Sequence, residues 1–144
     1  MSVTWVMVAN ASQAKLFANY GPKRGLQLIK ELLHPASREK TSNLVSDRSG
    51  ANSGPGHGAY IQATDPKHHE AERFALQVAR ELDEGRVQNS YDQLILVASA
   101  SFMGLVNGCL PVHVRSKVSK SIDKDYTKLP VKELTGHLQE VVQL

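Results

Sequence analysis

The sequence predicts a single α/β domain, residues 1–144, with a mixed sheet in a three-layer-like arrangement and the order β-β-β-α-β-α-(β)-α. Two continuous apolar runs, at residues 4–9 and 94–98, have the length and composition of buried central strands. Between them, residues 65–84 change to a helical period. Strands that alternate with helices in this way indicate a sheet covered by helices, and 144 residues suffice for one proper core.

The N-terminal part is expected to form an antiparallel meander. Residues 4–9, 14–20 and 26–33 are strand-like, and short turns rich in asparagine, glycine and proline separate them. Short turns between consecutive strands favour antiparallel pairing. Residues 30–33 also fit a helix, so the third strand has an alternative.

A long helix is expected over residues 65–84. Asp65 is placed to cap its N-terminus, Pro66 suits its first turn, and Gly85 is placed to end it. We expect the helix to pack on the sheet through an apolar stripe formed by Ala71, Phe74, Ala75, Val78, Ala79 and Leu82.

The second half of the chain is predicted to add a strand and two helices. Residues 94–98 form the buried strand, and residues 102–110 suit a short helix that two glycines weaken. Residues 112–123 fit either a helix or an edge strand such as 117–122. The last helix is expected to begin near Pro130, with an inner stripe of Val131, Leu134, Leu138 and Val141.

The composition is that of a globular protein, with 41% hydrophobic and 22% charged residues. The net charge of +3 permits an acidic partner without demanding one. A single cysteine, Cys109, excludes an internal disulfide and a site with several thiolates. The apolar runs are too short to span a membrane, and the first residues lack the positive region of a secretion signal. We therefore expect a cytoplasmic protein with no membrane span.

Residues 35–64 form a long polar loop without an apolar period. Connections beyond about 12–15 residues without secondary structure tend to be functional or disordered. Glycine lets a backbone approach a sugar or phosphate closely, and a run of backbone N–H groups can bind an anion. A flexible loop without a role is one interpretation. The other is a binding loop with the candidate residues Asp47, Arg48, Gly54, Gly56, His57, Gly58 and, just after the loop, Lys67.

Histidines in and beside the loop raise the question of a metal or hydrolase site. His68 and His69 are adjacent, so on a helix they point about 100° apart, which argues against joint metal binding. We therefore expect no metal, and no cofactor motif is present. A Ser53-His57-Asp47 triad lacks the strand–turn–helix elbow that presents such a nucleophile. A small hydrolase with a histidine and aspartate loop site remains an alternative.

A second candidate site is the charge cluster Asp123, Lys124 and Asp125 ahead of the last helix. It could cap that helix, pair with the loop or bind a partner. With few aromatic residues nearby, contact with phosphates would not read a base sequence. Basic residues surround this cluster. They either contact phosphates or form a solvated surface without a partner; they are Arg115, Lys117, Lys120, Lys124 and Lys128.

Several motifs occur together along the chain, namely Ser46–Gly50, Asp65-Pro66-Lys67 and Asp123–Thr127. In these motifs the sequence resembles the bacterial family named "protein required for attachment to host cells", and the resemblance extends from Trp5 to Leu138. That family is more distantly similar to the middle domain of archaeal and eukaryotic peptide-chain release factors.

The release-factor resemblance implies contact with the ribosome. In those proteins a Gly-Gly-Gln loop ahead of a long helix helps to hydrolyse peptidyl-tRNA. Residues 53–58 lie in the corresponding place, but their glycine cluster has no glutamine, and the nearest one is Gln62. Enzyme activity therefore stays open, with the missing glutamine arguing against it.

Taken with the basic charge, the resemblance predicts a non-catalytic or weakly catalytic factor that associates with RNA, tRNA or the ribosome. Residues 46–58 would be its probe. One alternative is a protein-interaction module that affects attachment to host cells. The other is the small hydrolase named above.

Overall fold

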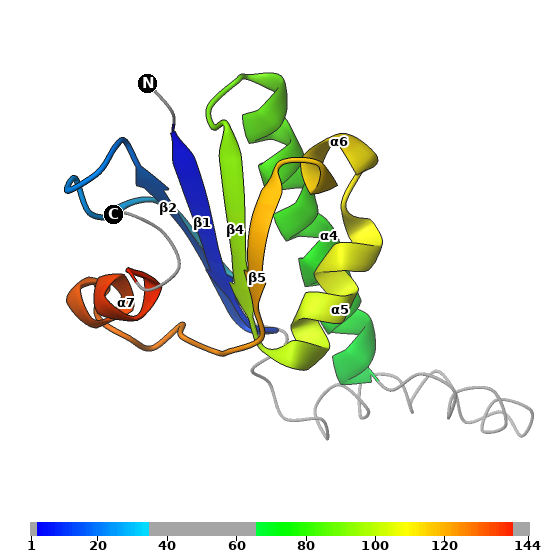
Figure 1. Ribbon diagram of the computed structural model, residues 1–144. Coiled ribbons are helices and arrows are strands. Elements are labelled where there is room, and N and C mark those ends of the chain that lie inside the picture. Colours follow the sequence, from blue (N-terminus) through cyan, green and yellow to red (C-terminus); the bar gives the residue numbers. More distant parts are fainter. Residues whose placement is uncertain (1–2, 35–65, 140–144) are drawn as a thin grey trace, which may run out of the picture.

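The computed structural model describes residues 3–34 and 66–139. The loop at 35–64 and the proposed cap Asp65 lie outside the described residues. Figure 1 shows a twisted sheet with α4, α5 and α6 on one face and α7 on the other. This confirms the α/β class and the three layers.

The antiparallel meander is confirmed. Strand β1 spans Thr4–Ala9, β2 spans Gln13–Asn19 and β3 spans Gln27–Leu33. The β1–β2 turn is closed by Asn10, whose backbone N–H donates to the Gln13 carbonyl at 2.9 Å. Pairing with β2 as a strand decides against the helical alternative for the end of β3.

The remaining strands extend the sheet in parallel from the other edge of β1. Strand β4 (Gln93–Ala98) pairs with β1, and β5 (Val118–Ile122) pairs with β4, which gives the order β3-β2-β1-β4-β5. Helix α4 (Pro66–Val87) and helix α5 (Ala100–Cys109) make the two crossovers. The ambiguous segment contains both elements: a short α6 (Val112–Arg115) precedes β5, and α7 spans Val131–Leu138.

Both faces of the sheet are apolar, as two buried central strands require. On one face, the stripe of α4 and part of α5 pack on alternate strand residues such as Met7, Leu16 and Leu96. On the other face, Leu134 and Leu138 of α7 pack with side chains of β1, β2 and β4. The predicted stripe of α4 is therefore confirmed. In the predicted α7 stripe Leu134 and Leu138 are buried, but the placement of Val131 is wrong, since its side chain is 42% exposed, and Val141 lies outside the described residues.

The predicted end of the long helix at Gly85 is wrong. Helix α4 continues to Val87, and the chain leaves it through Asn89, which has a positive φ of 56°. Gly85 is buried, and a Cβ on it would lie 2.6 Å from two ring atoms of Trp5. The glycine is required here by the close approach of the Trp5 ring and not by a change of backbone direction.

Cys109, at the end of α5, is partly buried and packs against the core on the α4 side of the sheet. Within the part of the chain that is described, none of the helices is both long enough and apolar enough to cross a membrane.

Candidate functional site

Strands β1, β3, β4 and β5 run in the same direction, so their C-terminal ends meet at one end of the sheet. This is the lower end in Figure 1, where helix α4 also begins. Ligands of α/β proteins commonly bind outside the C-terminal ends of parallel strands. The polar residues gathered there are therefore candidates for a site.

Asp125 lies over the end of β1 in a network of short hydrogen bonds. Asn10 Nδ2 donates to Asp125 Oδ2 at 2.9 Å and to Thr127 Oγ1 at 3.1 Å. Thr127 donates its backbone N–H and its hydroxyl to Asp125 Oδ1, at 3.0 and 2.6 Å. Lys15 Nζ donates to the Thr127 carbonyl at 2.9 Å. The network ties the β5–α7 connection to the β1–β2 hairpin.

The network also sets the ionisation of Asp125. Partial burial alone would raise the pKa of this carboxyl, but the hydrogen bonds from Thr127 and Asn10, with the charge of Lys128, lower the pKa below its usual value. Thr127 is only 1% exposed, and its hydroxyl has both a donor and an acceptor partner. We call Asn10, Asp125 and Thr127 the clamp, because their side chains hydrogen-bond to one another and hold two parts of the chain together.

The other two residues of the predicted charge cluster do not join this clamp. Asp123 and Lys124 are exposed, and neither forms an ion pair with a described residue. Lys124 instead continues a line of lysines along the outer edge of the sheet. A role for the three together in binding a partner stays a prediction.

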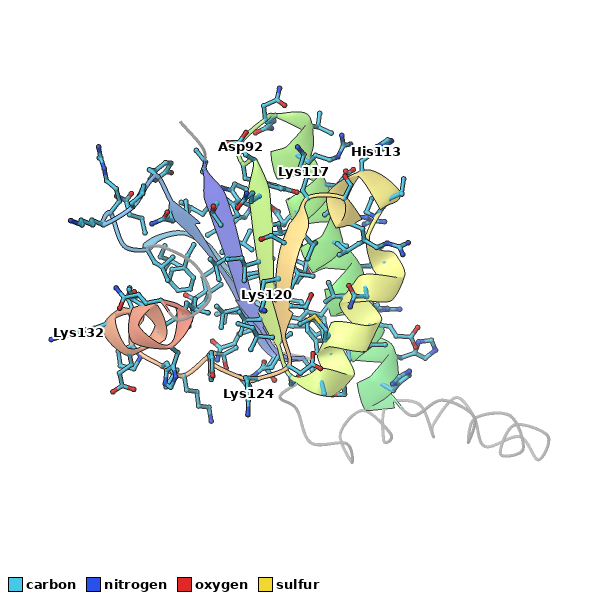
Figure 2. All side chains as sticks on the ribbon, in the orientation of Figure 1. Asp92, His113, Lys117, Lys120, Lys124 and Lys132 are labelled. Atoms are coloured by element: carbon cyan, nitrogen blue, oxygen red, sulfur yellow. The ribbon has the colours of Figure 1, made fainter. Side chains whose placement is uncertain are left out.

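Figure 2 shows Lys117, Lys120 and Lys124 following one another along β5 and past its end. We call these three residues the β5 lysine row. Strand β5 is an edge strand, and Lys120 and Lys124 are exposed, whereas Lys117, directly before the strand, is partly buried. Residues 112–132 contain six lysines and arginines and two aspartates, a net charge of +4 where the whole chain has +3.

Some basic residues on the opposite edge of the sheet and on α4 form ion pairs. Lys30 of β3 pairs with Glu81 at 2.7 Å, and Arg86 pairs with Asp83 at 2.9 Å. By contrast, no described residue forms an ion pair with the lysines of the row. Nearby Asp92 accepts a hydrogen bond from the Val3 backbone N–H at 2.8 Å. The row therefore presents positive charge that the described fold does not neutralise.

A histidine–glutamate pair at the same end of the sheet was missed by the sequence reasoning. His34, just after β3, has its Nε2 atom 2.9 Å from Glu70 Oε2, and its ring stacks on Phe74 at 5.0 Å. The side chains of His34 and Glu70 are only 16% and 20% exposed. No local spacing signals this pair, because 36 residues separate its members.

The predicted loop site falls mostly outside the described residues. This applies to Asp47, Arg48, Gly54, Gly56, His57 and Gly58, which stay predictions. Lys67 lies in the first turn of α4. His68 and His69 are both exposed on that helix, and His68 Nε2 lies 3.1 Å from Glu72. Among the residues with described positions, no three histidine, cysteine or acidic side chains gather as a metal site would require.

Comparison with known proteins identifies the family. A family model described as "Protein required for attachment to host cells" matches residues 5–138. The match covers nearly the whole chain, so the chain belongs to this family. No curated protein matches the sequence closely enough to serve as a relative.

Among solved structures, 13 chains match. One is described as an archaeal protein, with a TM-score of 0.53 and 14% sequence identity. The match covers 96% of this chain and 33% of that one, so this chain spans about a third of the archaeal protein's length. At this identity the likeness shows the fold alone, and the release-factor resemblance stays a prediction.

Proposed function

We propose that this member of the host-attachment family binds RNA through its phosphate groups, along the β5 lysine row. The observation that carries the proposal is the row itself, three neighbouring lysines on an open sheet edge that have no ion-pair partner among the described residues. The resemblance to release factors suggests that the RNA is ribosomal or transfer RNA.

The spacing of the row suits an extended polyanion. Lys120 lies in β5, Lys117 directly before the strand and Lys124 two residues past its end, so the three charges are spread along the edge. A lysine side chain is long and flexible and acts as a point charge, so neighbouring lysines can follow the phosphates of a strand. Ser119 and Ser121 are exposed between them and can donate hydrogen bonds to phosphate oxygens. No aromatic residue stands in residues 115–125, so this contact would not select bases.

The test compares two variants of the full chain that lose equal charge. The first carries Lys117→Gln, Lys120→Gln and Lys124→Gln. The control carries Lys23→Gln, Arg24→Gln and Lys132→Gln, three exposed positions that lie between β2 and β3 and on α7. Binding to a single-stranded RNA such as poly(U) is measured by fluorescence anisotropy at several salt concentrations.

If each lysine of the row contacts one phosphate, the first variant should lose about 2 from the slope of log affinity against log salt. The control should keep most of the wild-type slope. Equal losses in both variants would mean that total charge and not the row attracts RNA. Lysines on an edge strand also keep sheets from pairing with one another. Unchanged RNA affinity with new aggregation in the first variant would assign the row to that role.

In the same proposal, residues 46–58 contact the ribosome. Co-sedimentation with purified ribosomes should therefore weaken when residues 53–58 are deleted. Binding that is absent at low salt, or indifferent to both the deletion and the row variant, would refute ribosome association.

A further inference from the structure

Helices α4 and α5 leave an open groove on the face that points away from the sheet. The groove has a volume of about 490 Å³, and its walls include Leu76 of α4 and Gly104, Leu105 and Gly108 of α5. A second hollow continues it toward the end of α4, beside Ala79. The groove therefore follows much of the length of α4.

The floor of the groove is apolar and open. A Cβ placed on Gly104 or Gly108 would meet nothing within 4 Å. Leu76 stands beside these glycines and is 40% exposed, although its neighbours Ala75 and Val78 are fully buried. An exposed leucine next to an open glycine surface can be covered by an apolar side chain from outside.

Charged residues of α4 flank Leu76 in a pattern that is complementary to itself. Glu72 lies four residues before Leu76 and Arg80 lies four residues after it. His69 and Asp83 lie seven residues before and after it. All four positions border the two hollows, so they share one side of the helix with Leu76.

From this pattern we infer that the α4–α5 groove binds a second copy of this chain, with the two α4 helices antiparallel and crossing at Leu76. A two-fold interface repeats each contact, so residue positions that are symmetric about Leu76 face each other. Glu72 then faces Arg80 of the second copy, and Arg80 faces Glu72 of the second copy. His69 and Asp83 are related in the same way. Leu76 of each copy then packs against Leu76 of the other, where both border the glycine-lined groove.

The existing ion pairs of α4 leave the central contact available. Arg80 forms no ion pair with a described residue. Among the described residues, Glu72 forms its one ion pair with His68, at 3.1 Å, and both side chains are about half exposed. Asp83 already pairs with Arg86 at 2.9 Å, so the outer contact with His69 contributes less. The interface therefore depends on Leu76 and on the two copies of the Glu72–Arg80 contact.

Sedimentation equilibrium of the full chain tests this inference. The wild type should approach twice the chain mass of 15.8 kDa as its concentration rises. Leu76→Glu places two carboxylates at the centre of the interface and should raise the dissociation constant at least about tenfold. Val131→Glu is the matched control, since Val131 is 42% exposed and lies on α7, across the sheet. It should leave association unchanged. A wild type that stays monomeric up to its solubility limit would overturn the inference.

Charge reversal tests the antiparallel register. Glu72→Arg alone places arginine against Arg80 of the second copy, and Arg80→Glu alone places glutamate against Glu72. Each should raise the dissociation constant about tenfold through two repulsive contacts. The two positions are eight residues apart on one helix and do not contact each other within a chain. The double reversal should therefore restore association only if the helices pair as proposed.

Circular dichroism during thermal unfolding verifies that each variant is folded. A dimer that both single reversals leave intact, or that the double reversal fails to restore, would show that another surface joins the copies. The inference does not depend on RNA binding, because the groove and the β5 lysine row lie on different elements. The row variant should therefore associate like the wild type.

Discussion

The contact between Gly85 and Trp5 makes a quantitative prediction about a single methyl group. Gly85 lies inside α4, where alanine would normally be the better residue. The added Cβ would lie 2.6 Å from both Cη2 and Cζ3 of Trp5 and 3.2 Å from Cε2 of Tyr91. The Trp5 ring itself packs on Tyr91, with ring centroids 4.9 Å apart. Relief of the clash therefore requires movement of two aromatic rings.

The expected magnitude follows from two opposing terms. Glycine in a helix interior lowers stability by about 1 kcal/mol relative to alanine, so this term alone would raise the free energy of unfolding of Gly85→Ala by that amount. Forcing extra volume into a packed site costs about 1–3 kcal/mol. We expect a net loss of about 1 kcal/mol in the free energy of unfolding. Gly136→Ala in α7 is the control, because nothing lies within 4 Å of its added Cβ. The free energy of unfolding of Gly136→Ala should therefore rise by about 0.5–1 kcal/mol.

Urea unfolding followed by fluorescence measures both variants. Trp5 is the one tryptophan of the chain, so its emission reports directly on the displaced ring and should shift to longer wavelength in Gly85→Ala. Replacement of the ring by Trp5→Leu should make Gly85→Ala less harmful than it is in the wild type, as circular dichroism can measure. If Gly85→Ala stabilises the protein as much as Gly136→Ala does, the close-approach argument is wrong.

Three further substitutions test the core, a buried hydroxyl and the clamp. Phe74→Ala, at a fully buried ring, should lower the free energy of unfolding by about 3–5 kcal/mol in chemical denaturation. Tyr91→Phe removes the hydrogen bond to the Leu82 carbonyl, at 2.7 Å, and should cost about 1 kcal/mol. It should also remove from the ultraviolet titration the step at about 12, the pKa to which burial raises Tyr91. Thr127→Val should destabilise by about 1 kcal/mol at neutral pH, because its hydroxyl no longer donates to Asp125 or accepts from Asn10. Because the folded state lowers the pKa of Asp125, its contribution is present above the unfolded pKa and disappears as pH falls through the folded pKa. The gap between wild type and Thr127→Val should thus narrow in acid, and a gap that widens would contradict this account.

Most of the fold could be predicted from the sequence because its signals are local. Each local pattern predicts both the type of element and the side of it that is buried. This holds for the apolar runs at 4–9 and 94–98 and for the stripe of α4. The end of α4 could not be predicted in this way. Gly85 has the same sequence signature as a helix terminator, and only the position of Trp5, eighty residues earlier, reveals its other role.

In the candidate site, too, local features could be predicted from the sequence and contacts between distant residues could not. The basic charge of residues 112–132 is visible in the sequence, but only the structure shows that the β5 lysine row has no ion-pair partner among the described residues. The clamp joins Asn10 to Asp125 across 115 positions, so no spacing rule could have connected them. The same holds for His34 and Glu70, which the ends of β3 and α4 bring together.

The hydrogen-bonded network at the end of β1 and the β5 lysine row together favour binding along the sheet edge over catalysis at the C-terminal ends of the strands. At the end of β1, the amide of Asn10, the carboxylate of Asp125 and the hydroxyl of Thr127 already satisfy one another. A ligand that bound there would have to break hydrogen bonds that close the fold, at a cost of about 1 kcal/mol or more for each. The β5 lysine row carries no such cost, because its charges have no ion-pair partner among the described residues to give up. An anionic partner that lies along the edge gains attraction without disturbing the core.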